Sequence, residues 1–247
     1  MRRSTLAIAV LVLVFAANCA GAVTSSNILK RVKAAESRVK DIKADMVITE
    51  ANKGNVSRMG KGYGDILMLQ KAKVYYKKPD RIRFDGYAKG IKVTYIQNGY
   101  KKLILAAMIR KVEDAKNDPG KRQDSLDLGF LSSRLWTDNY VKVISTESNG
   151  VVKLKFDPKH GDKDKRHDMV WVDPNTLKVI RRQKFRGSGE LRVKNVYSDF
   201  VMLGGKLPIA TESKMYNGAG QMLGSVKYTN VKANTGLSSS LFSLSAR

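Results

Sequence analysis

The sequence has very little cysteine and histidine for its length. Its 247 residues include one cysteine, Cys19, and two histidines, His160 and His167. Because Cys19 lies in a segment that we expect to be removed, the folded part would contain no thiol. That excludes a disulfide scaffold, a thiolate zinc site and a cysteine nucleophile. The stability of the fold must then come from a hydrophobic core.

Acidic residues are also scarce. There are 22 Asp and Glu against 46 Lys and Arg, so the formal net charge is +24, or +22 without Arg2 and Arg3. The basic residues are spread along the chain, and such a charge favours anionic partners such as phospholipid headgroups, lipopolysaccharide or acidic polymers. A generally basic proteome in the source organism would give the same composition.

Long hydrophobic runs are absent except at the N-terminus. A run from Leu6 to Ala17 follows two arginines and precedes Ala20-Gly21-Ala22. This pattern is typical of a secretory signal peptide and is too short to span a bilayer. We expect a signal peptide over residues 1–22 and one exported domain over 23–247. Lipid anchoring at Cys19 is the alternative, but Asn18 is a poor residue before a lipidated cysteine.

The first element of the mature chain is predicted to be an amphipathic helix. Ser25, Ser26 or Asn27 can supply its N-cap. Apolar residues then recur at spacings of three and four, which places them on one face: Ile28, Val32, Ala35, Val39 and Ile42. Packing against the core is favoured over membrane-surface binding, although the polar side is mostly basic.

From Asp45 onward, short runs rich in Val, Ile, Tyr and Phe alternate with Gly, Asn, Asp and Pro, which predicts strands and turns. Thirteen candidate strands can be read, and we expect about eleven to be real. The candidates are 45–50, 64–69, 73–77, 81–87, 92–96, 101–105, 140–146, 151–156, 169–173, 179–185, 190–200, 209–216 and 222–228. Asn98-Gly99, Asn149-Gly150, Asp173-Pro174 and Asn217-Gly218 predict the turns of an antiparallel meander.

Alternation within the strands shows that the sheet has one dry face. Val152, Leu154 and Phe156 would lie opposite Lys153 and Lys155. A second helix is predicted between Asp124 and Trp136, where it could fill the concave side. The fold class is therefore mainly β (α+β), an incomplete antiparallel β-barrel with helices covering its concave apolar face.

A signal peptide is followed by an amphipathic helix that runs into a first strand, and three segments of sequence come later in the chain. They are Lys78-Pro79-Asp80-Arg81-Ile82-Arg83-Phe84, the strand-turn-strand Val170 to Ile180, and the closing Leu241-Phe242-Ser243-Leu244. This order and these segments resemble the LolA-like family of outer-membrane lipoprotein-sorting proteins. The resemblance spans nearly the whole mature chain. It implies a half-barrel whose apolar hollow holds the acyl chains of a lipoprotein or lipid. No single position here matches the arginine that holds the lid in LolA, and the chain is longer and more basic than LolA.

Candidate residues for the wall of that hollow are aromatic and apolar side chains from strands and from the second helical segment. From strands they are Tyr76, Phe84, Tyr95, Leu105, Trp171 and Phe185, and from the helical segment Phe130, Leu131, Leu135 and Trp136. The resulting hypothesis is a periplasmic carrier of lipoprotein acyl chains or envelope lipids between the inner and outer membranes. A membrane transporter would be its donor and an outer-membrane acceptor its destination, with a monomer as the working form. An envelope sensor or structural binding protein with the same pocket is the alternative.

Catalytic and nucleic-acid-binding classes lack their usual motifs. No Gly-x-Ser-x-Gly, phosphate-binding Gly-Lys-Thr or paired-carboxylate motif occurs. His160, Asp162, Asp164 and His167 lie in a loop with several basic residues, at spacings that fit no common zinc or calcium site. Stacking of nucleic-acid bases on tyrosines among lysines is disfavoured by export. We expect no catalytic residues, no metal and no cofactor.

Overall fold

The computed structural model describes residues 23–59, 67, 69–116, 118, 122–159 and 165–245. The predicted signal peptide, Cys19 and His160 lie outside these residues, as do Asp162 and Asp164. The helices are α1 (Ser25–Glu36), α2 (Lys53–Arg58), α3 (Arg134–Asp138) and the 3-10 turn η3 (Ser239–Phe242).

One sheet contains all thirteen strands of the described residues. They are β1 (Asp41–Ala51), β2 (Lys71–Lys77), β3 (Arg81–Ala88), β4 (Ile91–Asn98), β5 (Lys101–Ala106), β6 (Ile109–Asp114), β7 (Asn139–Thr146), β8 (Val152–Pro158), β9 (His167–Val172), β10 (Val179–Phe185), β11 (Leu191–Leu203), β12 (Leu207–Asn217) and β13 (Met222–Ala233). Their order is β6-β5-β4-β3-β2-β1-β13-β12-β11-β10-β9-β8-β7.

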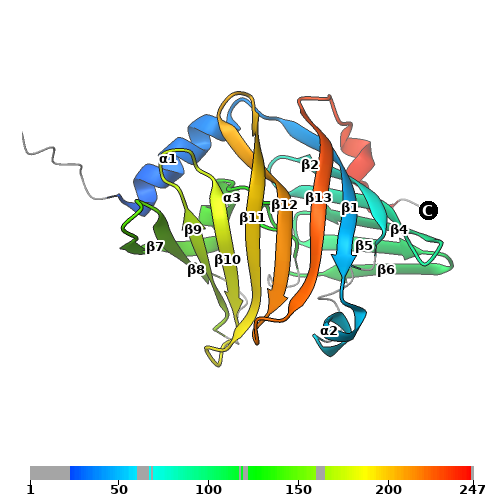
Figure 1. Cartoon of the computed structure of the whole chain (residues 1–247). Helices are drawn as coiled ribbons and strands as arrows, with labels where there is room; N and C mark the ends of the chain where they lie inside the picture. The colour runs from blue at the N-terminus through cyan, green and yellow to red at the C-terminus, as the bar shows by residue number, and fades with distance from the viewer. Residues whose placement is uncertain are drawn as a thin grey trace, which may run out of the picture.

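All neighbouring strands are antiparallel, and the sheet does not close. In Figure 1 it curves so that β4 to β6 run behind and across β11 to β13, while α1 and α2 lie at opposite ends. The predicted open half-barrel with a concave face is therefore confirmed.

The strand count of about eleven was too low. Twelve candidate strands match observed strands, and the four predicted turns join neighbouring strands. The candidate 64–69 lies mostly outside the described residues, and neither Leu67 nor Leu69 is in a strand. β6 was missed because it is an edge strand whose side chains are nearly all exposed, so it shows no alternation of dry and wet positions.

Helix α1 has the predicted apolar face. Ile28, Val32 and Ala35 are buried, and α1 packs against β12 and β7. The N-cap is Thr24 rather than the predicted serines or asparagine, since its hydroxyl oxygen accepts a hydrogen bond from the Asn27 amide at 3.2 Å. The helix ends at Glu36, so Val39 and Ile42 reach the core from the connection and from β1.

The predicted helix from Asp124 to Trp136 is mostly a series of turns, and only its end is helical, in α3. The Asp124 carboxylate accepts hydrogen bonds from the amides of Leu126 and Asp127, which favours a turn. Gly129 has a φ of +76°, and a Cβ there would meet the Cβ of Ala210 at 2.7 Å. Close contact with β12 thus replaces a continuous helix.

Topology explains why this segment fills the hollow. β6 and β7 are consecutive along the chain but form opposite edges of the sheet. The chain between them must cross from one edge to the other, and it crosses the concave side. We call residues Arg122–Asp138, which include α3, the plug segment.

Candidate functional site

The concave face of the sheet is apolar along most of its length. Buried side chains from strands on both sides of β1 form one cluster with the buried residues of α1. Members from the strands include Met46, Val74, Tyr76, Ile82, Phe84, Val152, Leu154, Phe156, Val170, Val172, Ile209 and Val226. The sheet therefore presents the continuous dry surface that alternation in its strands predicts.

The plug segment covers this surface with apolar side chains of its own. Leu126, Phe130, Leu131 and Leu135 are all buried in the same cluster. The rings of Phe130 and Tyr76 meet edge to face, with centroids 5.2 Å apart. The hollow is thus filled by the chain itself.

A small cavity remains beside the plug segment. Its volume is about 130 Å³, and its lining combines Tyr76, Phe156 and Phe185 with arginines and aspartates. That is room for roughly four water molecules, whereas pockets for drug-sized ligands occupy about 300 to 1,000 Å³. This cavity is therefore too small for an acyl chain, which could occupy it only if the plug segment moved.

Polar contacts hold the plug segment to β10. Arg182 donates to both carboxylate oxygens of Asp124, at 3.0 and 2.6 Å, and to Asp127 at 2.9 Å. Its Nε donates to Asp168 of β9 at 2.7 Å. Lys184 donates to Asp127 at 2.9 Å. The Arg182 side chain is 4% exposed and that of Asp124 is 32% exposed, so the cluster is sheltered from water at the arginine and reaches the surface at Asp124.

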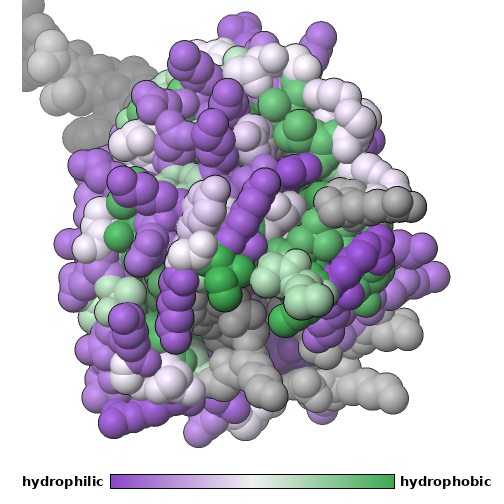
Figure 2. All heavy atoms as spheres, turned by 90° about the vertical axis from the view of Figure 1, so that its right-hand side faces the viewer, coloured by the Kyte–Doolittle hydropathy of each residue, from purple (hydrophilic) through white to green (hydrophobic). Residues whose placement is uncertain are grey.

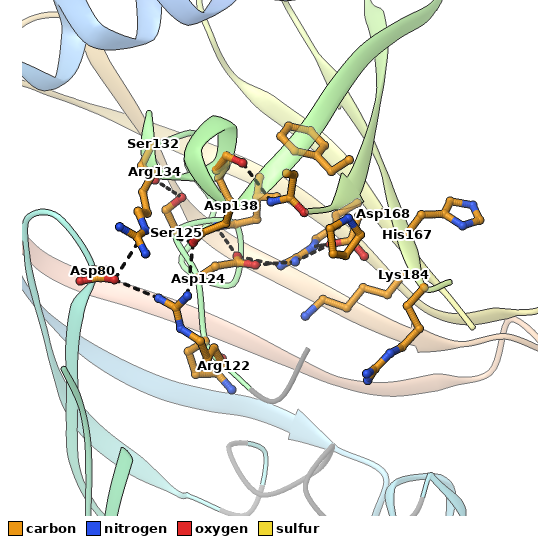
Figure 3. A pocket seen from close by; sticks show the side chains of 18 of the residues that line it. Asp80, Arg122, Asp124, Ser125, Ser132, Arg134, Asp138, His167, Asp168 and Lys184 are labelled. Atoms are coloured by element: carbon orange, nitrogen blue, oxygen red, sulfur yellow. Dashed lines mark hydrogen bonds and ion pairs between the residues drawn. The ribbon is translucent and has the colours of Figure 1, made fainter. Parts of the chain in front are cut away.

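A second ionic cluster ties the plug segment to the turn between β2 and β3. Arg122 donates to Asp80 at 3.0 Å and to Asp138 at 3.2 Å, and Arg134 donates to Asp138 at 3.0 Å. Figure 3 shows Arg122 and Arg134 both directed towards Asp80. Arg122 also lies over the ring of Tyr100, 4.5 Å from its centroid.

Helix α1 supplies a third attachment. The Glu36 carboxylate accepts a hydrogen bond from the Ser133 amide at 2.9 Å, and Trp136 Nε1 donates to Ser25 Oγ at 2.9 Å. Three groups of polar contacts, on β10, at the β2–β3 turn and on α1, therefore surround an apolar plug.

Burial and ion pairing compete in the cluster on β10. Burial disfavours the charged form of Asp127, but Lys184 and Arg182 outweigh it and lower the pKa of this carboxyl. Burial raises the pKa of the Asp124 carboxyl. Arg182 lowers this pKa and Asp127 raises it, and the net direction is upward. Burial would lower the pKa of Arg182, but Asp124, Asp168 and Asp127 hold it well above its ordinary value.

Seven of the ten residues predicted for the wall are part of the concave cluster or pack against it. They are Tyr76, Phe84, Tyr95, Phe130, Leu131, Leu135 and Trp136. The rings of Phe84 and Tyr95 lie 5.9 Å apart, and those of Trp136 and Phe156 lie 5.6 Å apart. Phe185 lines the small cavity and stacks on His167 at 4.8 Å.

Leu105 and Trp171 lie on the convex face instead. Leu105 packs with Ile96, Leu103 and Phe242 in a separate cluster. Trp171 pairs across the sheet with Lys153 and Arg181, and Arg181 lies 3.8 Å from its ring centroid. Side chains alternate between the two faces of a strand, so the neighbouring residues Ile104 and Val170 lie on the concave face. The prediction for these two strands was therefore wrong by one residue.

Sequence reasoning missed the charged residues of the hollow. Arg182 and Lys184 face inward because the register of β10 against β9 shifts between Val179 and Arg181. Simple alternation from Val179 would have placed Arg181 inside. A signal was nevertheless present, since Arg181 and Arg182 put charge on both faces of one strand.

Two further features bear on chemistry. Among the described residues, no three His, Cys, Asp or Glu side chains are grouped so that they could hold a metal ion. None of the helices in the described part of the chain is long and apolar enough to cross a membrane.

Comparison with known proteins identifies the fold. No protein-family model matches the sequence, and the search of curated proteins gives no match. The chain is similar to the structure of a LolA superfamily protein from Nitrosomonas europaea, with a TM-score of 0.62, 13% identity, and 90% of this chain and 98% of that one covered.

Two other solved structures are similar over nearly their whole length. One is described as a putative outer membrane lipoprotein-sorting protein domain from Vibrio parahaemolyticus, with a TM-score of 0.59, 14% identity and coverage of 87% and 95%. The other is a DUF1329 family protein from Desulfovibrio piger, with a TM-score of 0.59, 14% identity and coverage of 88% and 96%. The chain thus has the LolA-like fold that its sequence motifs predict.

Proposed function

We propose that this protein is an exported, periplasmic carrier that binds the acyl chains of lipoproteins or lipids in its hollow and moves them between the inner and outer membranes. The observation that supports this proposal is the apolar concave face with a separate, polar-anchored cover. The sorting role named for the similar Vibrio structure agrees with it.

Exchange of apolar contacts would make binding reversible. Acyl chains would take the places of Phe130, Leu131 and neighbouring side chains of the plug segment against the sheet. Apolar area is worth roughly 25 cal/mol per Å² whether a plug or a ligand covers it. Loading would then exchange one apolar cover for another, and its free energy would be small enough to allow release.

The same geometry supports binding rather than catalysis. His167 is stacked on Phe185. The carboxylates Asp124 and Asp127 are engaged in ion pairs with Arg182 and Lys184. We therefore assign no catalytic residue.

An anionic membrane surface is the partner that we propose at the ends of the β3–β4 and β5–β6 hairpins. Tyr87, Ile91, Met108 and Ile109 are exposed there, close to the exposed Lys89, Lys92 and Arg110. Figure 2 shows this side of the molecule, where hydrophobic groups lie among hydrophilic ones. Apolar groups ringed by cations suit contact with anionic headgroups, where donor and acceptor proteins would meet the carrier.

Lipid extraction tests the carrier function. Organic extracts of the purified protein, analysed by mass spectrometry, are expected to contain stoichiometric lipid that is absent from a basic exported control. Phe84→Glu places a charge in the concave cluster and is expected to abolish lipid uptake, whereas Lys153→Glu on the convex face is expected to preserve it.

Circular dichroism would show that both variants fold. Phe84→Glu that folds and still takes up lipid would contradict the concave site. Wild-type protein that is empty and ignores added lipid would contradict the carrier function and favour an envelope sensor.

A further inference from the structure

The wall of the hollow contains two cations, the buried Arg182 and the half-buried Lys184, with which the acyl chains of a ligand can form no ion pair. Arg182 and Lys184 project from β10 into the concave side, and Asp168 of β9 is the carboxylate of the sheet that contacts Arg182. Two further carboxylates of the described residues contact this pair, and both, Asp124 and Asp127, belong to the plug segment. The charge balance of the wall therefore depends on the plug.

Movement of the plug segment disturbs this balance. When Asp124 and Asp127 leave, Arg182 loses three of its four short hydrogen bonds to carboxylates and Lys184 loses its contact with Asp127. Arg182 then keeps only its ion pair with Asp168, in place of three carboxylates. A buried cation that loses part of its charge compensation is costly. A hollow filled only with methylene groups would carry that cost.

We infer that the ligand carries an anionic group, a phosphate or carboxylate of its headgroup, which takes the places of Asp124 and Asp127 beside Arg182 and Lys184. This inference rests on the proposed function. It adds that the ligand is an acidic lipid.

The geometry of the existing contacts supports this replacement. Arg182 donates hydrogen bonds to both carboxylate oxygens of Asp124, one from each terminal nitrogen. A guanidinium group makes the same bidentate arrangement with a phosphate. The small cavity lies beside this contact, and Arg166 and Arg192 are also in its lining. While the hollow is closed, Asp124 and Asp127 thus occupy the positions beside Arg182 that the anionic group of the ligand would take.

A headgroup series on the wild-type protein is the first test. Dioleoyl phosphatidylglycerol and dioleoylglycerol share the same acyl chains and differ in the phosphate. Displacement of a pyrene-labelled diacylglycerol is expected at about tenfold lower concentration of the phosphatidylglycerol, the scale of one charge-assisted contact. Inorganic phosphate alone is expected to displace nothing.

Variants then locate the effect. Arg182→Met is expected to remove most of the preference for phosphatidylglycerol, and Arg181→Met is its matched control because Arg181 lies on the same strand but faces Trp171 on the convex side. Replacing Asp124 and Asp127 together by asparagine removes the internal competitor. That double variant is expected to bind phosphatidylglycerol more tightly and to show a larger preference for it.

Each result separates the two proposals. If neither lipid displaces the probe and the probe itself does not bind, the carrier function fails. If both lipids bind equally, the carrier function stands and the anionic headgroup is overturned. If inorganic phosphate binds to the site on its own with the affinity of the lipid, the site is one for free anions and not for a lipid headgroup. The wild-type series decides these outcomes even if Arg182→Met does not fold.

Discussion

Two segments outside the sheet cover apolar strand residues, one on each face, and they are attached differently. The plug segment covers the concave face and is anchored at its rim by ion pairs to Arg182, Lys184 and Asp80. The second segment, Leu237–Leu244, covers the convex face of β4 and β5, and we call it the C-terminal cover. Its anchor is Phe242, fully buried between Ile96 and Leu103.

The attachments differ in what can replace them. Lys77 and Arg83 donate hydrogen bonds to backbone carbonyls of the C-terminal cover, at 2.5 and 2.8 Å. The main attachment, however, is the apolar ring of Phe242, which is stabilised only by its burial. The ion pairs of the plug segment give a small net stabilisation, because desolvation offsets much of their attraction, and another anion could take over the same cations. The same sheet thus carries one cover whose ion pairs another anion could replace, the plug segment, and one that is held by a buried aromatic ring, the C-terminal cover.

The largest effect is expected from removing the anchor of the C-terminal cover. Phe242→Ala should lower the free energy of unfolding by about 3 to 5 kcal/mol, because it leaves a cavity at a fully buried aromatic site. Urea unfolding measures this. Leu241→Ala, at a half-buried neighbour, should cost clearly less. Equal losses in the two variants would contradict the role of Phe242 as the anchor.

A smaller and more local effect is expected at the plug segment. Arg182→Met should lower the free energy of unfolding by about 3 kcal/mol, the low end for breaking a buried ion pair, because Lys184 remains and Asp124 is partly exposed. Hydrogen exchange should accelerate mainly in the plug segment. Arg181→Met, which loses a convex cation–π contact, should cost less than about 1 kcal/mol. Uniform acceleration over the whole sheet would contradict a local attachment.

The sequence predicted the sheet better than the covers, for a physical reason. Strands such as β8 alternate strictly because one face is dry, so Val152, Leu154 and Phe156 could be assigned from sequence alone. The plug segment has apolar residues at helical spacing but folds as turns, because Gly129 must approach β12 and Asp124 bonds to nearby amides. Tertiary contact overrode local pattern there.

The residues of the candidate site that could be predicted from sequence differ from the others in the same way. Aromatic residues of the concave face, such as Tyr76 and Phe84, were predicted, because burial of an apolar strand face follows from alternation. The cationic pair Arg182 and Lys184 was not, because a register shift in β10 reverses which side chains face inward. Such shifts depend on the pairing with β9, which local sequence does not encode.

The smallest effect expected is an acid response that distinguishes the two covers. Asp41 accepts hydrogen bonds from the amides of Thr235 and Gly236, which directly precede the C-terminal cover, and of Leu237, its first residue. Burial disfavours its charged form, but these bonds outweigh it and lower the pKa of Asp41 below the ordinary 3.8. A lowered pKa means that the stabilisation is complete above pH 3.8 and is lost as the pH falls through the folded value.

Exchange of the Thr235 and Leu237 amides, measured by NMR, should therefore accelerate as the pH falls below 3.8, after correction for intrinsic rates. Asp41→Asn should abolish this dependence, and Asp45→Asn, at a more exposed site of the same strand, should preserve it. The plug segment should respond less uniformly, because the pKa of Asp127 is lowered whereas that of Asp124 is raised. If both covers loosened together in acid, global unfolding would be the cause, and the two attachments would not be independent.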